Sequence, residues 1–101
     1  MGSPAGIELD RVARNYRAAF LRYLPRREEA ALASAYEIGR SAVMSGLSLL
    51  ALTQIHHQVL LEVLTDTSAE DLERTATAAS EFLLEALATY DMTQRRLHET
   101  T

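Results

Sequence analysis

Four stretches of the chain repeat their apolar residues at steps of three and four, which is the period of an amphipathic α-helix. The first predicted helix covers residues 7–24, and four arginines lie away from its apolar stripe, which consists of Ile7, Leu9, Val12, Ala13, Tyr16, Ala19, Phe20, Tyr23 and Leu24. Pro25 is expected to end this helix, because its ring disfavours a helical conformation at the preceding residue and removes a backbone donor.

Gly46 separates the second and third predicted helices, and a glycine is suited to the left-handed residue that closes a helix. The second helix opens with Glu28 and Glu29, whose charges suit the positive end of a helix dipole. Its stripe contains Leu32, Ala35, Tyr36, Gly39, Ala42 and Val43. Ser48 is the expected N-cap of the third helix, which ends near Asp66. The stripe of that helix contains Leu49, Leu52, His56, Val59, Leu60, Val63 and Leu64.

The fourth predicted helix is the longest. Ser68, followed three residues later by Asp71, resembles a capping box, and neither Pro nor Gly interrupts the chain from there to Thr101. A helix of about 28 residues is ~42 Å long at 1.5 Å per residue, so its last turns are expected to project beyond the bundle. Its expected core stripe is Leu72, Ala76, Ala79, Leu83, Ala86, Leu87 and Tyr90.

The connections between these helices are only a few residues long, so consecutive helices are expected to fold back as neighbours. The predicted fold is therefore all-α, an antiparallel four-helix bundle with a long C-terminal helix. A chain of 101 residues is too short for two domains, and we expect one domain over residues 1–101. The start at residues 1–4 resembles what a cleaved expression tag leaves, and no structural weight is placed on it.

Composition excludes several classes of protein. Cysteine is absent, which excludes disulfides, thiol catalysis and thiolate metal sites. The net charge of -4 disfavours non-specific binding to nucleic acid. The charge is also uneven, because six Arg stand against two acids up to Arg27 and four Arg against twelve acids after it. This asymmetry suits a first helix packed against acidic neighbours, and a row of arginines that contacts DNA phosphates is the rival interpretation.

Neither a membrane span nor a signal peptide is predicted, because no apolar run approaches the length needed to cross a bilayer and the chain starts without the tripartite pattern of a signal. The cytoplasm is the expected location. Without nucleic-acid binding or a membrane anchor, the remaining classes of partner are proteins and small molecules.

The polar residues offer no pattern typical of catalysis. His56 and His57 are adjacent on a predicted helix, where they point about 100° apart and cannot easily bind one metal ion. His56 falls within the apolar arc and is predicted to be a hydrogen-bonded core residue. The acidic residues lack the Glu-x-x-His motif of di-iron bundles, and no phosphate loop or nucleophile elbow is present. We therefore predict no enzyme, no cofactor and no metal site.

A second apolar row on the fourth predicted helix is the most informative feature. Leu84, Ala88 and Met92 follow one another at four-residue steps, away from the expected core stripe. A helix that is apolar on two sides usually has two partners. The alternative is that Leu84 lies at the margin of the core and the other two residues are tolerated in water.

The second predicted helix has a smaller surface of the same kind. Ala33 and Met44 lie away from its core stripe, with Glu37 and Arg40 between them. Together with the row on the fourth helix, these positions predict a protein-binding surface that contains Ala33, Glu37, Arg40, Leu84, Ala88 and Met92.

Three stretches resemble the N-terminal domain family of RsbU-type phosphatases. They are residues 35–40 (AYEIGR), 55–60 (IHHQVL) and 81–87 (EFLLEAL), the last of which leads into 90–92 (YDM). The resemblance extends from about Tyr16 to Arg95, and the order and spacing of the stretches are more specific than any one of them. The Ala- and Arg-rich composition without Lys is similar to that of actinobacterial members.

The resemblance implies a small four-helix domain, often dimeric, at the N-terminus of a metal-dependent serine/threonine phosphatase of the general stress response, and a fold similar to part of the circadian protein KaiA. It implies that the domain is not catalytic and that it binds a switch kinase of the RsbT type, which turns on the attached phosphatase. It also implies a partner groove between the second and fourth helices, with Ala33, Leu84 and Ala88 in it. Because the sequence ends at Thr101, no phosphatase domain is expected within it.

The functional hypothesis is a regulatory interaction domain that forms a homodimer, binds an RsbT-like kinase or a related signalling protein, and controls an attached phosphatase in sigma-factor signalling. The alternative is a small-molecule sensor or a dimerisation domain at the start of a sensor kinase or another multidomain regulator. In the sensor version, the ligand lies in the bundle interior around His56, Tyr16, Tyr36 and Tyr90. The same apolar row can serve either a partner or a second copy, so the dimer face stays open.

Overall fold

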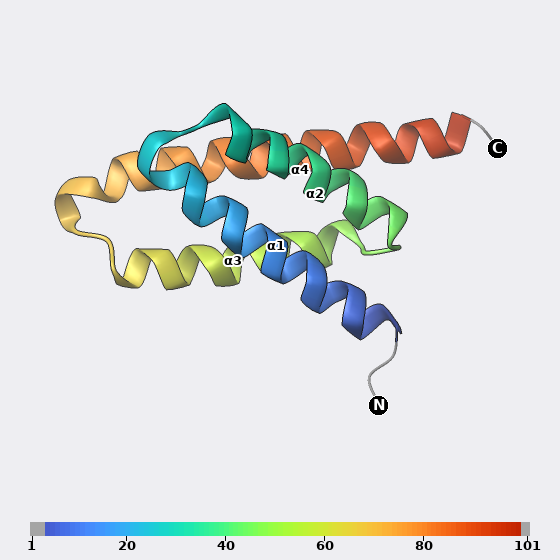
Figure 1. Cartoon of the computed structure of the whole chain (residues 1–101), viewed down its shortest axis with the longest axis horizontal. Coiled ribbons are helices and arrows are strands. Elements are labelled where there is room, and N and C mark those ends of the chain that lie inside the picture. Colours follow the sequence, from blue (N-terminus) through green and yellow to red (C-terminus); the bar gives the residue numbers. More distant parts are fainter. Residues whose placement is uncertain (1–3, 100–101) are drawn as a thin grey trace.

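The computed structural model describes residues 4–99, and all four predicted helices are present in this range. They are α1 (Pro4–Arg26), α2 (Glu29–Met44), α3 (Leu49–Thr65) and α4 (Leu72–Glu99). Each helix runs opposite to the one before it (Figure 1). The predicted all-α bundle with a long C-terminal helix is thus confirmed. Residues 1–3 of the stretch that resembles a tag remainder lie outside the described residues.

The first helix ends two residues later than predicted. Pro25 lies inside the last turn of α1, which continues to Arg26. The turn closes beyond the proline, because the backbone N–H of Arg27 donates to the carbonyl of Tyr23 at 2.7 Å. Arg27 adopts a positive φ of 50°, so it provides the left-handed residue after the helix that a glycine usually provides.

The boundaries between the next helices follow their local signals. Gly46 has a φ of 77° and follows the end of α2, as predicted. The hydroxyl of Ser48 accepts a hydrogen bond from the backbone N–H of Ala51 at 3.0 Å, so this residue caps α3 as predicted. The α3 helix then ends at Thr65, next to Asp66.

The side-chain cap predicted for the fourth helix is wrong. Ser68 does not accept a hydrogen bond from the backbone there, and its hydroxyl donates instead to the Asp71 carboxylate at 3.1 Å. A short 3-10 turn over Ala69–Asp71 comes first, and α4 begins at Leu72. The α4 helix has 28 residues, and Figure 1 shows its last turns extending beyond the other helices.

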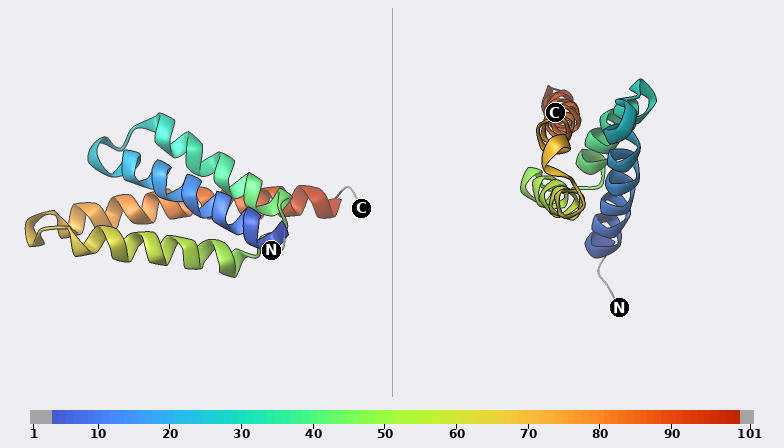
Figure 2. Two further views of the ribbon diagram at one scale, coloured as in Figure 1. Left: turned by 60° about the horizontal axis from the view of Figure 1, so that its bottom comes forward. Right: turned by 90° about the vertical axis from the view of Figure 1, so that its left-hand side faces the viewer.

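The helices do not pack in the order expected from the short connections. The end-on view in Figure 2 shows α1 and α2 on one side and α3 and α4 on the other. The most extensive contact joins α2 to α4, which run in the same direction, whereas the consecutive helices α2 and α3 hardly touch. Consecutive helices are therefore antiparallel, but the closest pair is not consecutive.

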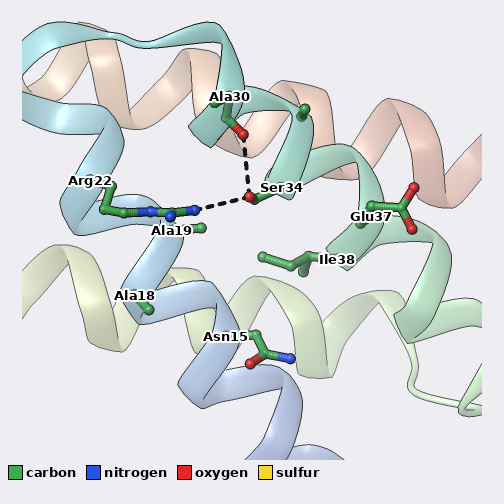
Figure 3. A pocket seen from close by; sticks show the side chains of 9 residues that line it. Asn15, Ala18, Ala19, Arg22, Ala30, Ser34, Glu37 and Ile38 are labelled. Carbon is green, nitrogen blue, oxygen red and sulfur yellow. Dashed lines mark hydrogen bonds between the residues drawn. The ribbon is translucent and has the colours of Figure 1, made fainter.

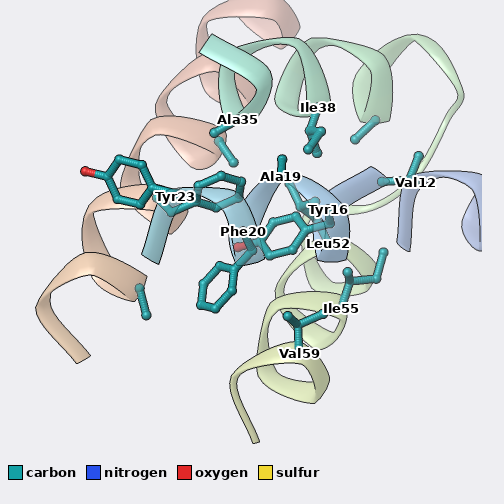
Figure 4. Packing of buried hydrophobic residues seen from close by; sticks show 14 of the residues in the cluster. Val12, Tyr16, Ala19, Phe20, Tyr23, Ala35, Ile38, Leu52, Ile55 and Val59 are labelled. Carbon is teal, nitrogen blue, oxygen red and sulfur yellow. The ribbon is translucent and has the colours of Figure 1, made fainter. Parts of the chain in front are cut away.

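The centre of the core is aromatic, as Figure 4 shows for the α1 side chains. Tyr16 and Phe20 are completely buried, and both rings lie nearly perpendicular to the ring of Phe82 from α4, with ring centres 5.0 and 5.4 Å apart. His56 from α3 lies edge-on to the same two α1 rings. Edge-to-face contacts are favourable because the positive ring edge meets the negative ring face. The buried residues form one continuous cluster.

The structure corrects parts of the predicted core stripes. Ile7, Leu9, Tyr36, Leu49, Leu72 and Ala76 are exposed, while Ala31, Ile38, Ile55, Ala78, Phe82 and Thr89 are buried although none was assigned to a stripe. On α2, α3 and α4 the buried face is turned by part of a turn from the predicted stripe, whereas the α1 stripe from Val12 to Tyr23 is buried as predicted. On α4, for example, the buried face is centred on Phe82 and Ala86, so Leu72 and Ala76 turn toward solvent.

Candidate partner-binding surface

The surface predicted from the sequence is formed by α2 and α4, which are held unusually close. A Cβ placed on Gly39 would lie 2.3 Å from the carbonyl oxygen of Ala86 and 3.0 Å from the Cβ of Thr89. Only glycine fits this position, because real Cβ atoms essentially never approach so closely. Ala35 and Ala42 are also completely buried on α2. Small residues on α2 therefore allow the close approach of the two helices.

A groove of about 430 Å³ opens along this contact. Its lining residues are Glu29, Leu32, Ala33, Tyr36 and Glu37 from α2 and Glu85 from α4. Tyr36, with 39% of its surface exposed, provides an aromatic face, and Leu32 is partly buried against the core. The floor of the groove is therefore apolar and its edges are acidic.

The second apolar row on α4 lies beside this groove and is not covered. Leu84 is 64% exposed and Met92 is 47% exposed, and Ala88 between them is exposed as well. Ala88 and Met92 follow the groove residue Glu85 by three and seven positions, so they share its side of the helix. Leu84 precedes Glu85 by one position and therefore points about 100° further outward.

All six residues predicted for the partner surface are exposed, and the structure places them unevenly. Ala33 and Glu37 line the groove, and Arg40 follows Tyr36 by one helical turn. Leu84, Ala88 and Met92 form the adjacent row on α4. Two of the six residues therefore line the groove, and their role in binding a partner stays a prediction.

Sequence reasoning missed the centre of the groove. Leu32 and Tyr36 were assigned to the core stripe, and Glu29 and Glu85 were not assigned to the site at all. A possible signal was the amphipathic nature of tyrosine, which often has its ring against apolar residues and its hydroxyl in water. The exposed Tyr36 fits that description, whereas its neighbour Ala35 is completely buried.

The charges around the groove are largely unpaired. Within residues 4–99, the carboxylates of Glu29, Glu37 and Glu85 make no ion pair, and neither does the guanidinium of Arg40. Most other arginines make an ion pair or a hydrogen bond, as Arg17 does with Glu62. Unpaired charges on one surface can attract a partner of opposite sign, and this surface has a net negative charge.

A second and larger groove, of about 530 Å³, lies on the other side of α2 (Figure 3). Four of its nine lining residues are alanines from α1 and α2, and the guanidinium of Arg22 donates a hydrogen bond to the hydroxyl of Ser34 at 3.2 Å. Ala33 and Glu37 line both grooves. These two residues therefore lie between the two grooves on the exposed side of α2 and are accessible from both.

The residues proposed for a small-molecule site are not brought together around a cavity. The hydroxyl of Tyr16 lies 2.6 Å from Nδ1 of His56, and the hydroxyl of Tyr90 donates to the carbonyl of Leu47 at 2.6 Å. Tyr36 lies outside, in the α2–α4 groove. Three of the four residues therefore make hydrogen bonds to each other or to the backbone inside a packed core. His56 is thus the hydrogen-bonded core histidine that the sequence predicts.

Among the residues that the structure describes, no three His, Asp or Glu side chains are grouped so that they could hold a metal ion. None of the helices within 4–99 is long and apolar enough to cross a membrane.

A known family matches most of the chain. Residues 14–93 match the family model described as phosphoserine phosphatase RsbU, N-terminal domain. No curated protein and no solved structure matches the chain. The matched range contains the main part of all four helices and both sides of the α2–α4 groove. Since this match covers most of the sequence, the chain belongs to the RsbU N-terminal domain family.

Proposed function

We propose that this domain is a non-catalytic docking module that binds an RsbT-like switch kinase in the cytoplasm and controls an attached phosphatase. Two independent observations support the proposal. The family is a regulatory one in RsbU-type phosphatase signalling. The structure has an uncovered apolar row next to a groove, on the two helices that pack most closely.

The observation that carries the proposal is the exposure of Leu84 and Met92 beside the groove. A monomer gains nothing by exposing these side chains, whereas burying one of them in an interface contributes about 1.5–3 kcal/mol. Tyr36 adds an aromatic side chain of the kind that is enriched at the centre of interfaces. The acidic edge around Glu37 and Glu85 favours a partner segment that carries arginine or lysine.

The long α4 helix provides a route from this surface to whatever follows it. Its exposed row belongs to the partner surface, and its last turns extend beyond the bundle (Figure 1). A partner that covers Leu84, Ala88 and Met92 would change the pose or the order of these last turns. A packed helix moves as a rigid element, so the signal needs no local chemistry.

Self-association is the second part of the proposed function. The domain forms a homodimer, as is common for the family it resembles, and the attached output domains are thereby brought together. The expected arrangement has one kinase on each α2–α4 surface.

Replacing Leu84 by Arg tests the docking surface. Binding to a purified RsbT-type kinase, measured by calorimetry, should weaken at least about tenfold, because one apolar anchor is lost and a charge is introduced. The matched control is Ile7→Arg, since Ile7 on α1 is 63% exposed and lies far from the surface in sequence. Both variants should keep the helicity and melting temperature of the wild type.

Two results would contradict the proposal. One is unchanged kinase binding by Leu84→Arg. The other is a weakening of equal size in the Ile7→Arg control, which would mean that the loss has no particular relation to α4.

A further inference from the structure

The groove between α1 and α2 differs in charge from the groove between α2 and α4. Its charged lining residues are Arg22 from α1 and Glu37 from α2, which lie at opposite ends of the groove in Figure 3. Within residues 4–99 the guanidinium of Arg22 makes no ion pair. The α2–α4 groove is lined by three glutamates and by no arginine. Of these two grooves beside α2, only the α1–α2 groove is therefore lined by a cation.

The guanidinium of Arg22 is held by a hydroxyl and not by an acid. It donates to the hydroxyl of Ser34 at 3.2 Å, and the same hydroxyl donates to the backbone carbonyl of Ala30 at 3.3 Å. A guanidinium has five N–H donors, and this contact uses one of them. The other donors match a carboxylate, which arginine binds through two parallel hydrogen bonds. Arg22 is thus positioned in the groove with donors left for an acidic group.

The rest of the groove is shallow and lined by short side chains. Ala18, Ala30 and Ala33 are exposed on its walls, and Ala19 and Ile38 are the buried residues of its floor. Sites for small molecules enclose most of the surface of their ligand, whereas six of the nine residues that line this groove are exposed. Short side chains allow the backbone of another helix to approach closely. The groove therefore fits a segment of a protein better than a small molecule.

The two grooves belong to one continuous surface, because Ala33 and Glu37 line both of them. A partner that fills the α2–α4 groove therefore reaches the edge of the α1–α2 groove as well. A specific interface takes up about 20–30 residues of each partner. The α2–α4 groove supplies six residues, and the row of Leu84, Ala88 and Met92 supplies three. A partner docked there needs more surface, and the α1–α2 groove lies directly beside it.

We propose that the partner docked on the α2–α4 surface extends across α2, and that one of its acidic side chains binds Arg22 in the α1–α2 groove. This inference rests on the proposed function and adds a second contact region to it. The partner then carries basic residues where it meets the carboxylates of the α2–α4 groove. Its acidic residue lies about one helix diameter, ~10 Å, away. The two signs fix the orientation of the partner, because a reversed partner would place acid against acid.

Nucleic acid fits this groove less well than an acidic protein segment. Arg11 and Arg26 lie on the same side of α1 as Arg22, and both are already paired with glutamates. The carboxylate of Glu37 at the other end of the groove would repel a phosphate backbone. A duplex is held by several free cations in a row, and this groove offers one.

Charge reversal of Arg22 tests the contact. Binding of a purified RsbT-type kinase is measured by calorimetry for the wild type, Arg22→Glu and the control Arg14→Glu. Arg14 is exposed on the same helix, makes no ion pair within residues 4–99 and lines neither groove. Arg22→Glu should raise the dissociation constant at least about tenfold, because the acidic residue of the partner then meets a carboxylate. Arg14→Glu should change it by less than about twofold.

Methyl NMR spectra of the complex give a measurement that does not depend on a substitution. On addition of the kinase, the signals of Ala18 in the α1–α2 groove and of Met92 in the α4 row should both change. The signals of Leu61, which is 52% exposed on α3, should stay in place. Both Arg variants should also keep the melting temperature of the wild type, which separates lost contact from lost fold.

The outcomes distinguish this contact from the proposed function. A wild type that binds no kinase would overturn both. If Leu84→Arg weakens binding and Arg22→Glu does not, the docking surface stands and the contact of Arg22 is wrong. Equal weakening by Arg22→Glu and Arg14→Glu would also overturn the contact, since the effect would then follow net charge alone. A short DNA duplex that binds the wild type but not Arg22→Glu would assign Arg22 to nucleic acid instead.

Discussion

Tyr16 on α1 and His56 on α3 are joined by a hydrogen bond inside the aromatic core, with 2.6 Å between the hydroxyl oxygen and Nδ1. Burial lowers the pKa of His56, with a further contribution from the charge of His57, and burial raises the pKa of Tyr16. Both shifts favour the neutral forms. In these forms the hydroxyl can donate to Nδ1, and the bond connects two helices through residues that are 40 positions apart in sequence.

The first prediction is that acid destabilises the fold through His56. The pKa of His56 is lower in the folded than in the unfolded chain, so below about pH 6.5 the unfolded chain binds the proton more readily. The contribution of His56 to the free energy of unfolding is therefore complete above about pH 6.5. It is lost as the pH falls through the lower pKa that His56 has in the folded chain. Urea unfolding between neutral and mildly acidic pH should show this loss.

The variant His56→Gln should remove that part of the pH dependence, because the titrating group is gone. His57→Gln is the control, since His57 is exposed on the same turn and its removal leaves the larger cause of the lowered pKa of His56, burial, in place, so most of the pH dependence should remain. A pH profile that is the same in His56→Gln and in the wild type would mean that other groups cause the acid sensitivity.

The second prediction concerns the contact between α2 and α4. Gly39→Ala should destabilise the protein by about 1–3 kcal/mol, because the new methyl group meets the backbone oxygen of Ala86, which cannot move away as a side chain can. Alanine is the better helix former by about 1 kcal/mol, so an effect of helix propensity alone would have the opposite sign. Thermal unfolding distinguishes the two, and a stabilised Gly39→Ala would show that the helices are further apart than described.

The third prediction concerns the anchor between α4 and the loop after α2. Tyr90→Phe should cost about 1–3 kcal/mol, because the buried carbonyl of Leu47 loses the donor that now lies 2.6 Å away. Tyr36→Phe is the matched control, since the side chain of Tyr36 is partly exposed, and its effect should be within about 0.5 kcal/mol. Urea unfolding of both variants measures the difference, and equal effects would argue against the anchor.

The fourth prediction compares two serines at the starts of helices. Ser48→Ala should destabilise the protein by about 0.5–2 kcal/mol, because Ser48 accepts a hydrogen bond from the N–H of Ala51. Ser68→Ala should cost less, because that hydroxyl contacts only the exposed carboxylate of Asp71. A larger loss for Ser68→Ala in thermal unfolding would show that Ser68 caps α4 in solution.

The existence and most boundaries of the helices could be predicted from the sequence because their causes are local. Gly46 and Ser48 act within one turn of their own positions, and the apolar period of each helix is a property of neighbouring residues. The exposed row at Leu84, Ala88 and Met92 could also be predicted, because a helix cannot turn two opposite sides toward one core.

Only the tertiary structure decided which helices approach each other and how far each is rotated. The contact at Gly39 depends on the backbone of α4, so nothing near this residue in the sequence identifies its partner. Tyr36 lines the groove although its spacing placed it in the core stripe, and Phe82 lies in the aromatic centre although its spacing did not. An apolar stripe predicts which side of a helix is buried, but only to within a fraction of a helical turn. The exact rotation of the helix about its axis depends on how its side chains fit those of the neighbouring helix.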